Sequence, residues 1–153
     1  MKKTKLFVEP TFDFELLGLV SPVKDYKMAW LINRDLNLAL VKSEDVKIEF
    51  VSSPRLEISQ YFLSLPHGYI QLLKNKALNT TQQLAYLIPE LRNLDYFLLV
   101  QDQTQQTSIA TFVDHLTRNP FIQSVVRLDI SKLKSKDNLL NYCLLYTSDA
   151  ADE

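Results

Sequence analysis

Two strand-like segments on either side of a short turn constrain the fold of this chain more than any other feature. Residues 58–65 (ISQYFLSL) and 69–78 (YIQLLKNKAL) are rich in large apolar side chains, and they flank Pro66-His67-Gly68. Such runs, separated by a short turn that contains glycine, are typical of a β-hairpin with Gly68 in the turn. Since a hairpin joins antiparallel neighbours, the sequence predicts a largely antiparallel sheet.

The spacing of apolar residues predicts the remaining elements. Strands are expected at residues 5–8, 12–20, 46–52, 94–100 and 125–130, where short apolar runs or alternating apolar and polar residues occur. A helix is expected from Val23 to about Leu40 and a second from Thr107 or Ser108 to Asn119-Pro120, because apolar positions recur there at helical spacing.

The ends and faces of the first helix also follow from residue types. Ser21 is a good N-cap and Pro22 suits the first helical position. Ala29 and Ile32 lie on the expected apolar face, and Met28 and Trp30 are expected to widen the part that is buried.

These elements predict an α+β fold in a single domain over residues 1–142. We expect a mostly antiparallel sheet of about five to six strands with two helices packed on one face. The final strand–helix–strand unit has the length for parallel pairing through a right-handed crossover. The specific topology expected is a ferredoxin-like core with extra strands.

Composition excludes several classes of protein. The 153 residues are 46% hydrophobic and 23% charged with a net charge of −1, which is ordinary for a globular protein and gives no bulk attraction to nucleic acid. No apolar run approaches the ~18 residues of a membrane span. No cysteine precedes Cys143, so neither disulfides nor a thiol site are expected before it, and a cytoplasmic location is predicted.

Site motifs are equally scarce. The chain has two glycines, too few for the glycine-rich loops that hold nucleotide phosphates. The two histidines, His67 in the proposed turn and His115 on the second helix, have neither the spacing nor the cysteine partners of a zinc site. We therefore expect no metal and no cofactor, and no catalytic residue can be assigned.

One segment combines two carboxylates with a proline. In IPELRNLDY, Pro89 forces Ile88 into an extended conformation, and Glu90 begins what can be one helical turn. Asp95 then stands where the chain enters the predicted strand at residues 94–100. Either these carboxylates accept local backbone hydrogen bonds, which is the commoner role, or they form a general acid and base pair.

The same segment resembles the signature of the bacterial IPExxxVDY family. The signature positions are Ile88, Pro89, Glu90, Leu94, Asp95 and Tyr96, with Leu94 in place of valine. Residues 12–21 (FDFELLGLVS), 24–33 (KDYKMAWLIN) and 72–78 (LLKNKAL) also resemble that family. The resemblance implies a small soluble protein and assigns it no activity.

The last eleven residues do not resemble the lysine-rich segment that precedes them. CLLYTSDAADE, residues 143–153, resembles the translation of a transposase adapter used in sequencing libraries. We therefore expect a fragment from a metagenomic or draft assembly whose natural sequence continues beyond Asn141 or Tyr142. The adapter-derived tail is expected to form no packed part of the core.

Three classes of function remain. The leading expectation is a non-enzymatic interaction or scaffold module that forms homo-oligomers or binds another protein, and the first alternative is a small-ligand-sensing domain. An RNA-associated protein is the second alternative, suggested by the lysines near the C-terminal end and by the gene context that the resemblance implies, although nucleic acid is not the expected partner. The aromatic residues on the predicted strands are expected to pack in the core or at an oligomer face. The lysines are Lys132, Lys134 and Lys136, and the aromatics are Tyr61, Phe62, Tyr69, Tyr96 and Phe97.

Overall fold

The computed structural model describes residues 14–48, 56–78, 85–104 and 107–139. In chain order the elements are β1 (Glu15–Val20), α1 (Asp25–Leu36), β2 (Val41–Ile48), β3 (Leu56–Leu65), β4 (Gly68–Lys74), a 3-10 helix (Pro89–Leu91), β5 (Tyr96–Asp102), α2 (Ile109–Thr117), β6 (Ser124–Leu128) and a second 3-10 helix (Ile130–Lys132). The predicted strand at residues 5–8 and the tail at residues 143–153 lie outside the described residues.

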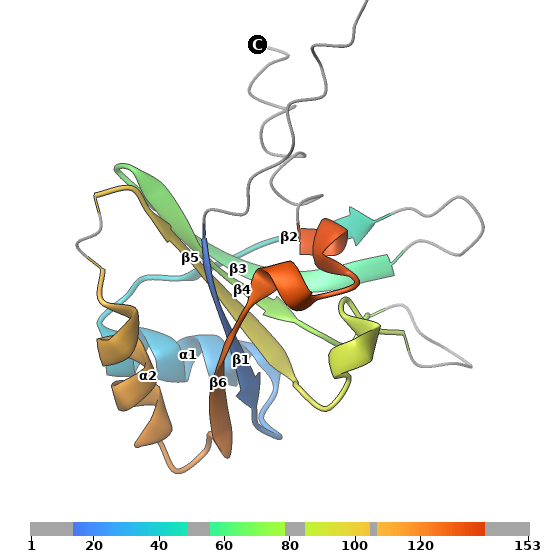
Figure 1. The fold of residues 1–153 in the computed structure, drawn as a ribbon. Coiled ribbons are helices and arrows are strands. Elements are labelled where there is room, and N and C mark those ends of the chain that lie inside the picture. The colour runs from blue at the N-terminus through green and yellow to red at the C-terminus, as the bar shows by residue number, and fades with distance from the viewer. Residues whose placement is uncertain (1–13, 49–55, 79–84, 105–106, 140–153) are drawn as a thin grey trace, which may run out of the picture.

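The six strands form one sheet in the order β2-β3-β4-β5-β1-β6, and every neighbouring pair is antiparallel. Both α-helices pack on one face (Figure 1), so the predicted α+β architecture is confirmed. Parallel pairing of the last strand with the strand before α2 is wrong, because β1 lies between β5 and β6. The order β6-β1-β5-β4 is that of a ferredoxin-like sheet, and β2 and β3 extend it beyond β4.

The central hairpin is confirmed, but glycine has a different role in it. Leu65 pairs with Gly68, so Pro66-His67 alone forms the turn and Gly68 is the first residue of β4. Its φ angle is not positive. A Cβ atom at this position would lie 1.9 Å from the backbone oxygen of Gln101 on β5. Gly68 is therefore required by the close approach of two strands.

Helix α1 begins later than predicted and buries a narrower face. It starts at Asp25 after Lys24, and no side chain caps its N-terminus. Ser21 does not cap it because the helix begins four residues later: the Ser21 hydroxyl accepts from the N–H of Val23, which precedes the helix, and donates to the backbone oxygen of Phe121 at 2.6 Å. Met28 is fully buried as predicted, whereas Trp30 is 56% exposed, so its expected burial is wrong.

The other predicted boundaries differ from the observed ones by as many as five residues. Ser108 caps α2 as expected, accepting from the N–H of Thr111 at 3.2 Å, and the helix ends before Asn119-Pro120. β2 begins at Val41 instead of residue 46, and β6 ends at Leu128 because Ile130 belongs to a 3-10 helix.

Apolar side chains cover both faces of the sheet. Under the helices, Leu17, Leu72 and Leu98 pack against the buried side of α1 and α2. On the opposite face, Leu16, Leu73 and Phe97 pack under the two 3-10 helices and the segments beside them. β5 is buried on both sides, which explains its continuous apolar run (YFLLV).

Candidate functional site

The IPELRNLDY motif wraps around one buried side chain, Asn75, at the end of β4. Asn75 is 0% exposed. Its Oδ1 accepts from the N–H of Ile88, and its Nδ2 donates to the backbone oxygens of Leu91 and Leu94, each at 2.9 Å. Because these bonds satisfy backbone groups along the whole turn, Asn75 fixes the path of the motif. The sequence carries little signal for this role, because in LLKNKAL Asn75 stands between two other polar residues, both lysines.

Asp95 and Tyr96 fasten the connection between β1 and α1 to the start of β5. The carboxylate of Asp95 accepts from the N–H of Ser21 at 2.8 Å. The hydroxyl of Tyr96 donates to the backbone oxygen of Val23 at 2.6 Å. Burial raises the pKa of the Tyr96 hydroxyl, and the nearby carboxylates of Asp25 and Asp95 raise it further. Tyr96 therefore stays protonated and acts as a hydrogen-bond donor.

Glu90 has a separate role. Its two carboxylate oxygens accept from the backbone N–H and the hydroxyl of Ser135, each at 2.8 Å, and so join the 3-10 helix Pro89–Leu91 to the C-terminal segment. The two motif carboxylates therefore accept hydrogen bonds from different residues: Glu90 from Ser135 and Asp95 from Ser21. Each accepts a backbone hydrogen bond, as in the first of the two roles expected from the sequence.

The Glu90–Ser135 link is expected to break in acid. Burial alone would raise the pKa of the Glu90 carboxyl, but the hydrogen bonds from Ser135 outweigh it and hold the pKa below the ordinary 4.5. The link is therefore intact above the ordinary pKa and is lost as the pH falls through the lowered value. In an NMR titration, the amide proton of Ser135 should shift with a midpoint below 4.5, and Glu90→Gln should abolish that shift. A midpoint at or above the ordinary value would contradict the assignment.

A pocket of about 230 Å³ opens beside the motif. It lies between the β1–α1 connection, the end of β4 and the start of β5. Three basic side chains line it, and Asp95 is the acidic side chain among its lining residues. The lining residues are Ser21, Pro22, Val23, Lys74, Lys76, Tyr86, Arg92, Leu94, Asp95 and Tyr96.

Among the described residues, the three cations of this pocket have no ion-pair partner. Within the described parts of the chain, the side chains of Lys74, Lys76 and Arg92 form no ion pair or hydrogen bond. One carboxylate oxygen of Asp95 accepts a hydrogen bond from the N–H of Ser21. The pocket therefore carries an excess of positive charge next to two tyrosine rings, Tyr86 and Tyr96, and its chemistry suits an anionic group.

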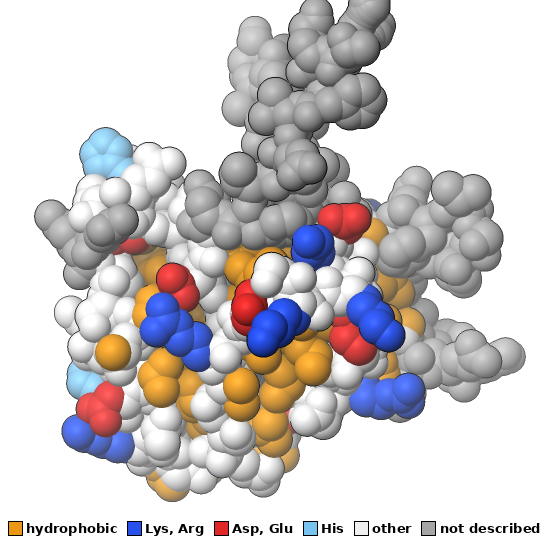
Figure 2. Space-filling view, viewed as in Figure 1, with side chains coloured by type: hydrophobic (Ala, Val, Ile, Leu, Met, Phe, Trp, Pro, Cys, Tyr) orange, Lys and Arg blue, Asp and Glu red, His pale blue; other side chains and the backbone are white. Residues whose placement is uncertain are grey.

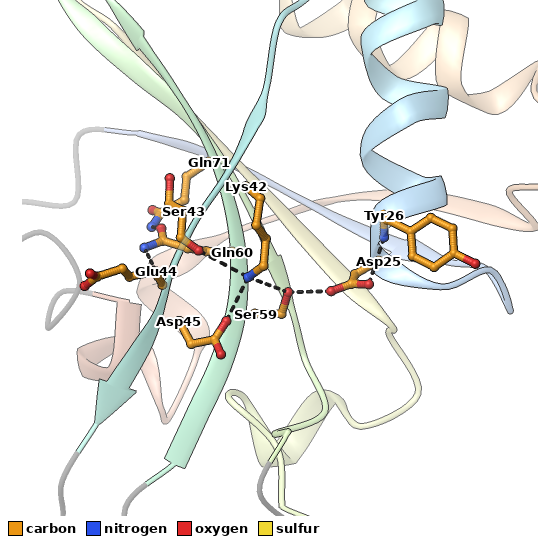
Figure 3. Close-up of polar contacts among 9 residues, drawn as sticks. All are labelled: Asp25, Tyr26, Lys42, Ser43, Glu44, Asp45, Ser59, Gln60 and Gln71. Carbon is orange, nitrogen blue, oxygen red and sulfur yellow. Dashed lines mark hydrogen bonds and ion pairs between the residues drawn. The ribbon is translucent and has the colours of Figure 1, made fainter.

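A second polar cluster joins the first turn of α1 to β2 and β3 (Figure 3). The hydroxyl of Ser59 donates to Asp25 at 2.5 Å, while the ammonium of Lys42 donates to Asp45 at 2.8 Å and lies 3.5 Å from the Ser59 oxygen. Ser59 is only 2% exposed and its proton is committed to Asp25. This arrangement holds the first turn of α1 on the sheet, and it offers no accessible nucleophile.

The other residues singled out in the sequence lie either at the surface or in the core. His67 is exposed in the hairpin turn, and His115 is exposed on α2, beside a shallow pocket lined by Arg34 and Arg118. Lys132 and Lys134 are exposed, and Lys136 is half-buried.

The aromatic residues that were predicted to pack do so in two ways. Tyr96 and Phe97 are buried on opposite faces of β5, and Phe62 stacks on Tyr69 with ring centroids 5.6 Å apart. Tyr61 packs under the helices.

The described residues contain no group of three His, Cys, Asp or Glu side chains that could hold a metal ion. Within the same residues, no helix is long and apolar enough to cross a membrane.

No similarity to a known protein adds to these observations. Comparisons of the chain with protein-family models, with curated proteins and with solved structures find no match.

Proposed function

We propose that this domain is a non-enzymatic binding protein whose pocket at the IPELRNLDY motif takes a small molecule with an anionic group. The observation that supports this most is the convergence of Lys74, Lys76 and Arg92 on one pocket without partners among the described side chains. A phosphate or carboxylate can accept hydrogen bonds from all three cations. The class is that of a small-ligand-sensing domain.

The surroundings of the pocket support binding over catalysis. Asp95 accepts a backbone hydrogen bond from Ser21, and the Tyr96 hydroxyl donates to a backbone oxygen. These hydrogen bonds hold both side chains in one direction, which suits recognition of a ligand. A general acid or base needs a group that is free to exchange its proton with substrate.

Thermal unfolding with candidate ligands tests this proposal. Inorganic phosphate and a set of phosphorylated and carboxylated metabolites are added to the full chain, and a ligand that binds only the folded state raises the unfolding midpoint. Lys76→Gln is expected to remove most of that rise, because it deletes a cation of the pocket. Lys47→Gln, which changes an exposed lysine on β2, should leave it intact.

Added salt provides a second readout, since the binding is electrostatic and should weaken as salt is raised. No rise with any anion, or an equal loss in both lysine variants, would contradict the proposal.

A second candidate function is a module that forms homo-oligomers, as the sequence led us to expect. It is favoured by large apolar side chains on the surface, which in soluble proteins often mark contact sites. In the part of the chain that the structure describes, those exposed by more than a third of their area are Tyr26, Trp30, Val41, Leu78, Phe121 and Val126. Tyr26 and Trp30 lie one helical turn apart on the outer side of α1.

We also propose that the chain belongs to the bacterial IPExxxVDY family and acts in the cytoplasm. The support for the family is the signature at Ile88–Tyr96, whose residues share one substructure around Asn75 and its neighbours. The support for the location is a chain without cysteine before residue 143. Expression of the intact gene in its host, followed by fractionation, tests the location.

A further inference from the structure

We propose that two copies of this chain pair through β6, in antiparallel fashion, to make one continuous sheet. This inference rests on the second proposed function and specifies its contact surface. β6 ends the sheet, and among the described residues no strand lies on its outer side. The N–H and C=O groups of an edge strand are a template for another strand, so the partner that fits here is itself a β-strand.

Symmetry fixes how two β6 strands can pair. A two-fold axis perpendicular to the sheet keeps each side chain on its own face, and residues opposite each other must point to the same face. One residue must therefore lie opposite its own copy. For full overlap of the five residues Ser124–Leu128, that residue is Val126.

The resulting neighbours are compatible. Val126 lies against Val126 of the second copy, and Ser124 lies opposite Leu128. Arg127, which pairs with Glu15 of its own chain at 2.9 Å, lies opposite Val125, so no like charges meet. Val126 is 39% exposed, and a valine pair at this position is a favourable cross-strand contact.

The other edge of the sheet lacks these properties. β2 has an irregular register between Ser43 and Val46, which interrupts regular pairing. When two antiparallel copies of Val41–Ile48 overlap as fully as the two-fold symmetry allows, either Glu44 or Asp45 lies opposite its own copy. Like charges directly opposite each other destabilise a strand pair. The two edges therefore differ, and only β6 is suited to self-pairing.

The face beside β6 adds apolar area to this contact. Figure 2 shows hydrophobic side chains gathered on the side of the sheet that lacks the α-helices, between basic and acidic side chains. Leu128 and Val20 are only partly buried there, next to Val126. The two-fold axis described above keeps this face on one side in both copies, so their apolar side chains become neighbours.

Sedimentation of the full chain at several concentrations tests the pairing. The wild type is expected to dimerise, and Val126→Lys to raise the dimer dissociation constant by about tenfold or more, because two ammonium groups then face each other. Val41→Lys is the matched control, since it changes a 60% exposed valine on the opposite edge. It should dimerise like the wild type. Circular dichroism of both variants checks that they remain folded.

Cross-linking distinguishes this edge from any other contact. In a Cys143→Ser background, Val126→Cys should form an intermolecular disulfide on oxidation, because opposite Cβ atoms lie about 5 Å apart. Val41→Cys should not. If the protein dimerises but Val126→Lys does not weaken the dimer and Val126→Cys forms no intermolecular disulfide, the β6 assignment is wrong, while the proposal of oligomer formation still holds. A wild type that stays monomeric at every concentration would overturn both, including the case where another segment of the same chain covers β6.

Discussion

Replacing Asn75 with alanine is expected to lower the free energy of unfolding by about 3–5 kcal/mol, since each buried group left without a hydrogen bond costs ~1–3 kcal/mol. The change leaves the N–H of Ile88 and the oxygens of Leu91 and Leu94 without their side-chain partner. It also leaves a small cavity beside the apolar side chains on the face of the sheet opposite the α-helices, which include Leu87 and Leu94. A loss of this size is a large part of the stability of an ordinary domain.

Urea unfolding measures this loss, and Asn93→Ala provides the control. Asn93 belongs to the same motif but is exposed, and its side chain forms no hydrogen bond within the described parts of the chain. Its replacement should change the stability by no more than about 0.5 kcal/mol. Equal effects of the two substitutions would show that Asn75 does not hold the motif in place.

Gly68→Ala is expected to cost about 2–3 kcal/mol, as overpacking of a close contact does. The added methyl group would lie 1.9 Å from the backbone oxygen of Gln101, so β4 and β5 must move apart at that end of the hairpin. Since this end of β4 is bonded to β5 as well as to β3, the strain is shared by the centre of the sheet.

Gly18→Ala is the informative comparison for this prediction. The nearest atom to its added methyl group is Cδ1 of Leu94 at 2.5 Å, the end of a flexible side chain. We expect this variant to lose only about 1 kcal/mol, because the leucine can adjust while a strand backbone cannot. Thermal or urea unfolding of both variants measures the difference. If Gly18→Ala were the more damaging, backbone approach would not be the reason for glycine at position 68.

Local chemistry in the sequence was enough to predict much of the sheet and both α-helices. The central hairpin, the Ser108 cap and the apolar run of β5 depend on neighbours in the chain, and each was confirmed, although Gly68 lies in β4 and not in the turn. The failures involve distant partners. Ser21 was predicted to cap α1, but it bonds Phe121, one hundred residues away. Trp30 was expected to be buried, although the sheet contacts only the Met28 side of its helix.

The candidate site shows the same division. The motif stood out in the sequence because proline and two carboxylates are close together there. Lys74 and Lys76 alternate along the chain, which places them on one side of an extended segment. Their meeting with Arg92 was not predictable, because it depends on the pairing of β4 with β5 and on the turn that Asn75 holds.

The central claim is that the pocket at the motif binds an anion, and an amide NMR titration of the full chain with inorganic phosphate tests it most directly. We expect shift changes that are saturable and concentrated at Ser21, Lys76, Arg92 and Asp95, which line the pocket. Lys76→Gln should weaken them, and Lys47→Gln should not. Changes confined to other parts of the surface, or no saturable change at all, would contradict it.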